Sequence, residues 1–263
     1  MPYTRDLVLV GGGHAHALVL KAWGMDPLPG ARLTVINPEP MAPYTGMLPG
    51  HVAGHYRRDD LEIDLVRLCR HAGARLILAR AIGIDRAQRN VMLQGRAPVA
   101  YDLASFDVGI TAKLGLPGFA EHGIRAKPLD VYAARWRSFL AAAAQGQATP
   151  DVAVIGGGVA GCELAMAMAF ALQAAGVRPR VTVIEVWPQI SGVTSQARQR
   201  MLSAMDDLGI VVKTSARVVE VRADQLLLDG DDPVAASFCV GAAGGFAHTW
   251  IAKTDLHQRD GFI

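Results

Sequence analysis

The residues most suited to chemistry lie in two glycine-rich turns. Each turn follows a short run of aliphatic, β-branched residues. A glycine turn between a strand and a helix lets a pyrophosphate come close to the backbone, and the helix N-terminus offers free N–H groups. Both turns are therefore predicted to bind nucleotide phosphates. The candidate residues are Gly11, Gly12, Gly13, His14, Ala15 and His16 in the first turn, and Gly156, Gly158, Val159, Ala160, Gly161 and Glu163 in the second.

The second turn carries the complete G-x-G-x-x-G pattern, with Gly156, Gly158 and Gly161 at the three glycine positions. Glu185 stands at the end of the next predicted strand, where a carboxylate accepts a hydrogen bond from a ribose 2′-hydroxyl and repels a 2′-phosphate. This pattern predicts NADH rather than NADPH. The alternative interpretation is a tight strand-to-helix turn that binds no nucleotide.

The first turn departs from the pattern, because His16 occupies the third glycine position and Asn37 occupies the acidic position. His16 can either pack between helix and strand or donate to a phosphate, and His14 and His16 can equally be ordinary residues at a helix N-terminus. Asn37 can accept from a ribose hydroxyl without carrying a charge. The first turn is therefore a weaker nucleotide site by its motif.

An internal repeat supplies the elements that position both turns. Each copy has a strand, the glycine turn, an apolar helix and a second strand, with the strands at 7–10 and 32–37 and again at 152–155 and 180–185. Alternating segments at 74–93 and 210–228 are predicted to be antiparallel β-meanders attached to a parallel sheet. Each copy then ends on a strand that runs into glycine, at 104–109 and at 235–241, and Gly241 is a further candidate for cofactor binding.

The predicted fold class is α/β, with two Rossmann-like three-layer domains that carry attached β-meanders, the second domain inserted in the first. A Gly- and Pro-rich stretch at 113–118 marks the boundary. The first domain is expected to span residues 1–113, with 246–263 returning to it, and the second 114–245. A charged helix is expected at 128–145 between the two copies.

Composition narrows the class of protein further. The 263 residues are long enough for two α/β domains, 51% hydrophobic content excludes disorder, and a net charge of +2 gives no argument for nucleic acid. Cys69, Cys162 and Cys239 form no metal-binding or disulfide pattern, which favours a reducing cytoplasmic compartment and no metal. The apolar run at 164–175 is too short to cross a bilayer, and no signal peptide precedes the first strand.

Two tandem dinucleotide folds with β-meanders resemble the two-dinucleotide-binding flavoproteins, the pyridine nucleotide-disulfide oxidoreductase superfamily. The segments 42–50 (APYTGMLPG), 53–56 (AGHY), 107–109 (DVG) and 127–128 (KP) are similar to the type II NADH dehydrogenase-like branch. Members of that branch occur alone or fused ahead of selenide,water dikinase. The resemblance implies that the first copy binds FAD and that Tyr44, Thr45 and Gly46 lie beside the flavin ring. A Pro/Gly surface loop is the alternative for residues 44–50.

The chain departs from the disulfide reductases because it lacks a redox-active cysteine pair, and Cys162 is expected to be an inert packing residue. The resemblance then implies direct hydride transfer from NADH to flavin, with the cofactors carrying the chemistry and no catalytic side chain required. Electrons would pass on to an unidentified small-molecule acceptor, a quinone being one candidate. Sulfide:quinone oxidoreductase activity is disfavoured by the cysteine positions.

The resemblance also raises an expectation about the C-terminal end. In the superfamily a segment resembling residues 260–263 leads into a strand ending in Gly-Asp beside the flavin and then into an interface domain. Because the sequence stops at Ile263, we expect a truncated chain that binds FAD weakly or not at all and keeps a folded NADH domain. The alternative function is a non-catalytic dinucleotide-binding module, or an inactive fragment linked to selenium metabolism. Its partner would be a second copy in a homodimer or a selenide,water dikinase domain.

Overall fold

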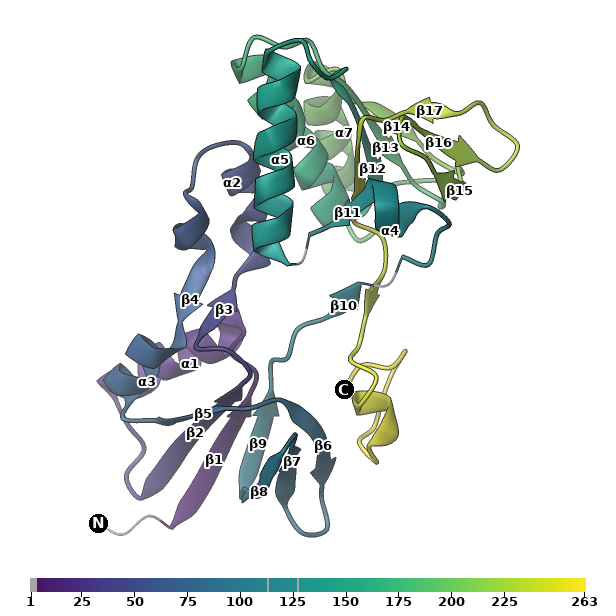
Figure 1. The fold of residues 1–263 in the computed structure, drawn as a ribbon. Coiled ribbons are helices and arrows are strands. Elements are labelled where there is room, and N and C mark those ends of the chain that lie inside the picture. The colour runs from purple at the N-terminus through teal and green to yellow at the C-terminus, as the bar shows by residue number, and fades with distance from the viewer. Residues whose placement is uncertain (1–3, 113, 127) are drawn as a thin grey trace. The chain divides into compact units, whose positions relative to one another are not determined.

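The computed structural model describes residues 4–112, 114–126 and 128–263, and the chain separates into two compact units (Figure 1). Unit 1 contains the described residues of Met1–Tyr44, Glu62–Thr111 and Gly245–Ile263, and unit 2 contains those of Thr45–Leu61 and Ala112–Gly244. Each unit is built on a parallel sheet, so the predicted α/β class with Rossmann-like folds is confirmed. Lys113, in the predicted domain boundary, and Lys127, in one of the segments that carry the resemblance, lie outside the described residues.

Unit 1 has a four-stranded parallel sheet in the order β5-β2-β1-β9. The strands are β1 (Arg5–Val10), β2 (Ala31–Asn37), β5 (Arg75–Leu78) and β9 (Leu103–Phe106). Successive residues of a strand point to opposite faces. Accordingly, Leu9 packs with Leu20 and Leu65 in a cluster formed with α1 (His14–Met25) and α3 (Leu65–Ala72). Val8 and Val10 pack on the other face against a meander of β6 (Ala81–Asp85), β7 (Asn90–Leu93) and β8 (Arg96–Ala100).

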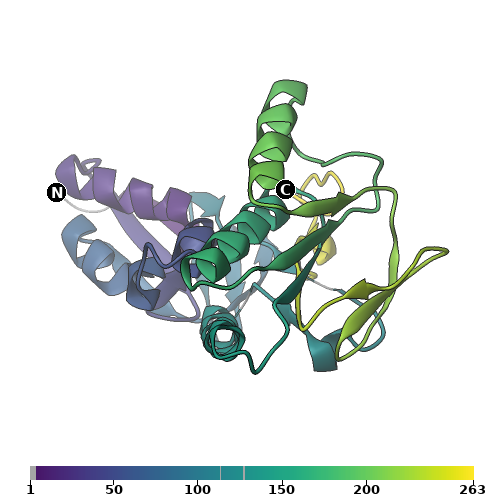
Figure 2. The same ribbon diagram turned by 90° about the horizontal axis from the view of Figure 1, so that it is seen from above.

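Unit 2 repeats this plan with a five-stranded parallel sheet in the order β11-β18-β12-β13-β14. The strands are β11 (Gly123–Arg125), β12 (Asp151–Ile155), β13 (Arg180–Ile184), β14 (Val211–Lys213) and β18 (Phe238–Gly241). One face packs against α5 (Leu129–Ala144), α6 (Val159–Ala174) and α7 (Ser195–Asp207). The other packs against a meander of β15 (Val218–Val221), β16 (Gln225–Leu228) and β17 (Val234–Ala235). Figure 2 shows α5, α6 and α7 beside this sheet from above.

The internal repeat predicted from the sequence is confirmed, but the meander prediction was wrong in one respect. The first strand of each alternating segment, β5 and β14, joins the parallel sheet, and the meanders are completed by β8 and β17 further along the chain. The helix expected at 128–145 is present as α5. Strand β11 was not predicted, and unit 1 has no strand paired at the equivalent position beside β9 among the described residues.

The remaining elements are short. Strands β3 (Met41–Pro43) and β4 (Glu62–Asp64) form an antiparallel pair, and β10 (Thr111–Ala112) pairs with β19 (Gly245–Phe246) where the chain passes between the units. Short helices complete the set: η1 (Thr45–Met47), α2 (Leu48–Val52), η2 (Arg58–Leu61), α4 (Phe119–His122) and η3 (Ile251–Lys253). No helix in the described part of the chain is both long and apolar enough to cross a membrane.

The segment Thr45–Leu61 groups with unit 2, although the sequence pattern predicts that it belongs to the first domain. Leu48, Val52 and Leu61 are buried in the cluster that α5 and α6 share, and the Trp136 indole N–H donates to the Val52 carbonyl at 3.1 Å. Leu48 is only 2% exposed, whereas Tyr44 and Gly46, in the same stretch 44–50, are exposed. Leucine and valine four residues apart lie on one helix face, so this short helix buries its apolar side.

Gly161 sets how closely α6 approaches the glycine turn. A β-carbon at Gly161 would overlap the Gly156 carbonyl oxygen, and it would lie 3.3 Å from the Ala242 methyl group. At Gly158, by contrast, the nearest atom to an added β-carbon is the Ser191 hydroxyl oxygen at 3.8 Å, and the backbone φ of −74° suits any residue. The third glycine therefore serves packing, and the second leaves open space.

Gly161→Ala is predicted to lower the free energy of unfolding by about 1–3 kcal/mol, because the extra methyl group must push helix and turn apart. Gly158→Ala is the matched control and should stay within about 0.5 kcal/mol of the parent protein. Urea denaturation followed by circular dichroism measures both. Equal stabilities of the two variants would contradict this account of the turn.

Candidate functional site

The second glycine turn is held at the carboxyl edge of the unit 2 sheet by hydrogen bonds that its backbone N–H groups donate. Gly156 adopts φ +111°, a conformation that glycine reaches without strain, and its N–H donates to the Ile184 carbonyl at 2.8 Å. The Gly157 N–H donates to Glu185 Oε2 at 2.7 Å. This arrangement fixes the start of α6 beside the ends of β12 and β13.

Glu185 follows directly after β13 and is only 4% exposed. Its second carboxylate oxygen accepts from the Trp187 N–H at 3.0 Å, so each oxygen holds one backbone group of the site. A carboxylate has about four acceptor positions. The group can therefore hold the turn and still accept from a hydroxyl that enters the neighbouring pocket.

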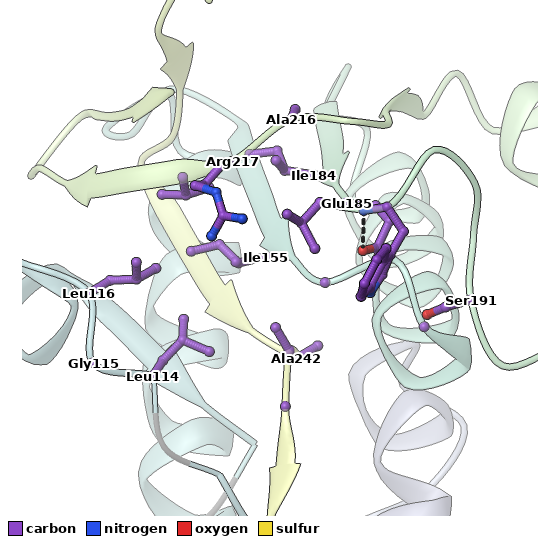
Figure 3. Close-up of a pocket in the computed structure, with 17 residues that line it drawn as sticks. Leu114, Gly115, Leu116, Ile155, Ile184, Glu185, Ser191, Ala216, Arg217 and Ala242 are labelled. Atoms are coloured by element: carbon purple, nitrogen blue, oxygen red, sulfur yellow. Dashed lines mark hydrogen bonds between the residues drawn. The ribbon is translucent and has the colours of Figure 1, made fainter. Parts of the chain in front are cut away.

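A pocket of about 460 Å³ opens beside this turn, within unit 2 (Figure 3). Its walls come from the carboxyl ends of β12, β13 and β18, the place where parallel α/β sheets bind ligands. The residues that line it are Leu114, Gly115, Leu116, Ile155, Gly156, Gly158, Ile184, Glu185, Val186, Trp187, Ser191, Ala216, Arg217, Val218, Ala242, Ala243 and Gly244. Predicted site residues Gly156, Gly158 and Glu185 are brought together here.

The other predicted residues of the second copy do not line the pocket. Val159, Ala160 and Gly161 form the first turn of α6, and Glu163 is exposed further along the same helix. Gly241 ends β18 and is buried, with the Phe119 ring 2.6 Å from where a β-carbon would stand. A packing requirement therefore accounts for Gly241 without a cofactor.

Sequence reasoning missed Trp187 and Arg217, which are exposed side chains on the pocket wall. Trp187 stands two positions after Glu185, so its proximity could have been inferred from the strand end. Arg217 reaches the pocket through the segment between β14 and β15, whose course the sequence pattern did not define.

The first glycine turn has the same backbone arrangement in unit 1. Gly11 adopts φ +95° and its N–H donates to the Ile36 carbonyl at 2.8 Å. The Gly12 N–H donates to Asn37 Oδ1 at 2.9 Å, while the Asn37 amide N–H donates to the Glu39 carbonyl at 2.7 Å. Asn37 thus takes the structural place of Glu185, as the sequence repeat implied, without its charge.

His16 is buried at 3% exposure and both of its ring nitrogens have protein partners. Nδ1–H donates to the Gly11 carbonyl at 2.7 Å, and Nε2 is hydrogen-bonded to the Ser105 hydroxyl at 2.9 Å. These contacts support the packing interpretation of His16 over donation to a phosphate.

Asp107 lies at the first glycine turn, a position that the sequence pattern did not indicate. One carboxylate oxygen accepts from the Ala15 N–H at 3.0 Å and from the His16 N–H at 3.2 Å. The same carboxylate fills the space where a β-carbon of Gly13 would stand. The N-terminus of α1 is therefore capped by a residue about ninety positions away in sequence.

Tyr44 and His14 lie together in unit 1, with ring centroids 5.4 Å apart. Two residues predicted to contact the same cofactor are thus neighbours. Thr45 and Gly46 form η1 and group with unit 2.

All three cysteines are buried and unpaired. Burial raises the pKa of Cys69 to about 11, and burial followed by the charge of Glu185 raises that of Cys162 to about 11. Burial raises the pKa of Cys239 to about 12. The Cys162 S–H points to the Gly157 carbonyl at 3.7 Å. A protonated, buried thiol is a poor nucleophile, which agrees with the packing role expected for Cys162. Within the described ranges, no group of three or more His, Cys, Asp or Glu side chains could hold a metal ion.

Solved structures share this fold over nearly the whole chain. Sulfide:quinone oxidoreductase from Aquifex aeolicus superposes with a TM-score of 0.78 at 19% identity, covering 95% of this chain and 61% of that one. NDH2 from Plasmodium falciparum in complex with NADH gives a TM-score of 0.76 at 16% identity, covering 95% and 57%. The NAD-dependent persulfide reductase from A. fulgidus gives 0.74 at 22% identity, covering 94% and 47%. The chain thus spans about three fifths or less of the length of these structures.

No curated protein matches the chain in sequence. Residues 5–263 match the family described as pyridine nucleotide-disulphide oxidoreductase. That match agrees with the two glycine turns and with the duplicated sheet, and it confirms the superfamily predicted from the sequence. The chain belongs to the pyridine nucleotide-disulphide oxidoreductase family.

Proposed function

We propose that the chain is the dinucleotide-binding part of an FAD-dependent NADH oxidoreductase, with NADH bound by unit 2 and FAD by unit 1. The observation that carries the proposal is the pocket at the second glycine turn, with the buried Glu185 carboxylate on its wall. The proposed domains are residues 1–113 with 246–263 for FAD and 114–245 for NADH. Residues 45–61 pack with the second of these.

The second turn fits NADH in three ways. The open space at Gly158 lets a pyrophosphate approach the backbone, and no side chain caps the N-terminus of α6 within the described residues. Glu185 offers acceptor positions to ribose hydroxyls, and its charge disfavours a 2′-phosphate. These residues bind and orient the nucleotide.

The assignment of FAD to unit 1 rests on the equivalence of the two turns and on family membership. Asn37 replaces Glu185 at the ribose position, and the His14 and Tyr44 rings lie at the start of α1 and just after β3. Asp107 already engages two N–H groups of that helix. A nucleotide phosphate therefore binds at the first turn only if the Asp107 carboxylate moves away from these N–H groups.

When both are bound, NADH supplies a hydride and FAD accepts it, so the protein contributes position and electrostatics rather than an acid or base. The raised pKa values of the cysteines support a route without a thiol relay. We propose a small-molecule acceptor, with a quinone as the first class to test, and a relationship to the type II NADH dehydrogenase-like branch. Fusion to or association with selenide,water dikinase, a homodimer and a cytoplasmic location remain predictions.

A second candidate function is a non-catalytic dinucleotide-binding module. The contact of Asp107 with the first turn favours it, because this contact leaves only the second turn open to a phosphate. Flavin content separates the candidates: protein saturated with FAD that turns over NADH supports the oxidoreductase.

The unmodified protein is predicted to bind NADH at least about tenfold more tightly than NADPH, because a 2′-phosphate would meet the Glu185 carboxylate at close range. Glu185→Ala should lower the ratio of the NADH affinity to the NADPH affinity. Glu185→Gln keeps an oxygen to hold the turn but removes the charge, so it should lower this ratio with less loss of NADH affinity. Isothermal titration calorimetry measures all six affinities. Equal affinities of the unmodified protein for both nucleotides would sink the assignment.

Cys162→Ser is predicted to leave the NADH oxidation rate within a few-fold of the parent rate, since the buried thiol packs in the core and its S–H points to the Gly157 carbonyl. Steady-state oxidation with a quinone analogue measures the rate, and thermal unfolding confirms that the variant is folded. A hundredfold fall, equal to about 2.7 kcal/mol in the barrier, would show that the thiol takes part.

A further inference from the structure

Asp107 occupies a position that is defined by the repeat. In unit 1 the Asp107 N–H donates to the Val10 carbonyl at 2.8 Å, and in unit 2 the Ala242 N–H donates to the Ile155 carbonyl at 2.9 Å. Val10 and Ile155 are the last residues of β1 and β12, directly before the two glycine turns. Asp107 and Ala242 are therefore equivalent positions, and only the first carries a charge.

The space at the second glycine of each turn differs for the same reason. At Gly158 the nearest atom to an added β-carbon is 3.8 Å away. At Gly13 the Asp107 carboxyl carbon and both carboxylate oxygens fill that space. This glycine is the one whose missing side chain lets a pyrophosphate reach the backbone. In unit 1 the cleared space is thus taken by an internal anion.

The N–H groups that a phosphate would use are engaged as well. Asp107 Oδ2 accepts from the Ala15 and His16 N–H groups at 3.0 and 3.2 Å, and α1 has no acidic residue in its first turn and no cap from its own N-cap residue, Gly13. A carboxylate at a helix N-terminus is stabilised by the helix dipole and by these hydrogen bonds. It competes for the same groups as a phosphate does.

We propose that Asp107 determines the nucleotide affinity of the first turn by acting as an internal competitor for the dinucleotide phosphate. Unit 1 binds FAD only in a state in which the Asp107 carboxylate has left the N-terminus of α1. The proposal rests on the assignment of FAD to unit 1 for the identity of its ligand, while the competition itself concerns any diphosphate at this turn.

The test compares the parent protein with Asp107→Asn and Asp107→Ala. The asparagine variant keeps an oxygen to accept from Ala15 and His16, and so protects α1 against loss of its cap, but it removes the charge. The alanine variant reproduces the equivalent residue of unit 2. FAD affinity is measured by quenching of flavin fluorescence, and thermal unfolding shows which variants are folded.

Both substitutions are expected to tighten FAD binding by about tenfold or more, because they remove the negative charge that competes with the phosphate and repels it. Near a protein surface, a contact between two like charges costs at least the free energy of a tenfold change in affinity. NADH affinity should not change. FAD affinity that is unchanged or weaker in folded Asp107→Asn would overturn the proposal. The reciprocal change, Ala242→Asp, should weaken NADH binding. Ala242→Asn is its uncharged control of similar size. Equal NADH affinities of these two variants would count against the proposal.

ADP separates this proposal from the assignment of FAD. Amide hydrogen exchange of the segment Gly11–Leu20 reports ADP binding at the first turn specifically. Tighter ADP binding there in Asp107→Asn, with no FAD bound by any variant, would support the competition and overturn FAD as the ligand of unit 1. Equal protection of this segment by ADP in parent and variant would overturn the competition whether or not FAD binds.

Discussion

Each glycine turn is anchored by a hydrogen bond from its middle glycine to a side-chain oxygen at the end of the neighbouring strand. In unit 2 the bond joins Gly157 to Glu185, and in unit 1 it joins Gly12 to Asn37. The turn also requires a positive φ at Gly11 and Gly156, so the bond stabilises a backbone that other residues adopt only with strain. Because the turn is fixed in this way, each helix begins beside the carboxyl edge of its sheet. The direction of the N–H groups at the start of each helix, the pocket in unit 2 and the proposed nucleotide contacts all depend on that placement.

The two units place their negative charge at different positions beside the glycine turn. Unit 2 has a carboxylate, Glu185, at the proposed ribose position and the neutral Ala242 beside the proposed phosphate position. Unit 1 has a neutral amide, Asn37, at the proposed ribose position and the Asp107 carboxylate beside the proposed phosphate position. A duplicated fold therefore does not imply duplicated affinity. Under the proposed function, this difference in charge leaves the second turn open to a dinucleotide, whereas the first turn must first release the Asp107 carboxylate.

Much of this arrangement could be predicted from the sequence because it is local. The two turns, the strands on either side of them and the place of Glu185 follow from spacing within about thirty residues. The burial of Leu48, Val52 and Leu61 was not predictable, since it depends on contacts with α5 and α6, which lie far along the chain; Val52 and Trp136, for example, are 84 residues apart. Strand β11 has three residues, too few for a periodic pattern. The cap on α1 was missed because Asp107 meets Ala15 only through the pairing of β1 with β9.

If unit 2 binds NADH and unit 1 binds FAD, as proposed, NADH reduces the flavin held by the same protein. Anaerobic mixing of NADH with the protein in the presence of saturating FAD tests it most directly, with flavin absorbance as the signal. The account predicts that flavin absorbance is lost much faster than in a protein-free mixture of NADH and FAD, and more slowly when NADPH replaces NADH. A rate of flavin reduction no greater than that of the protein-free mixture would contradict the account.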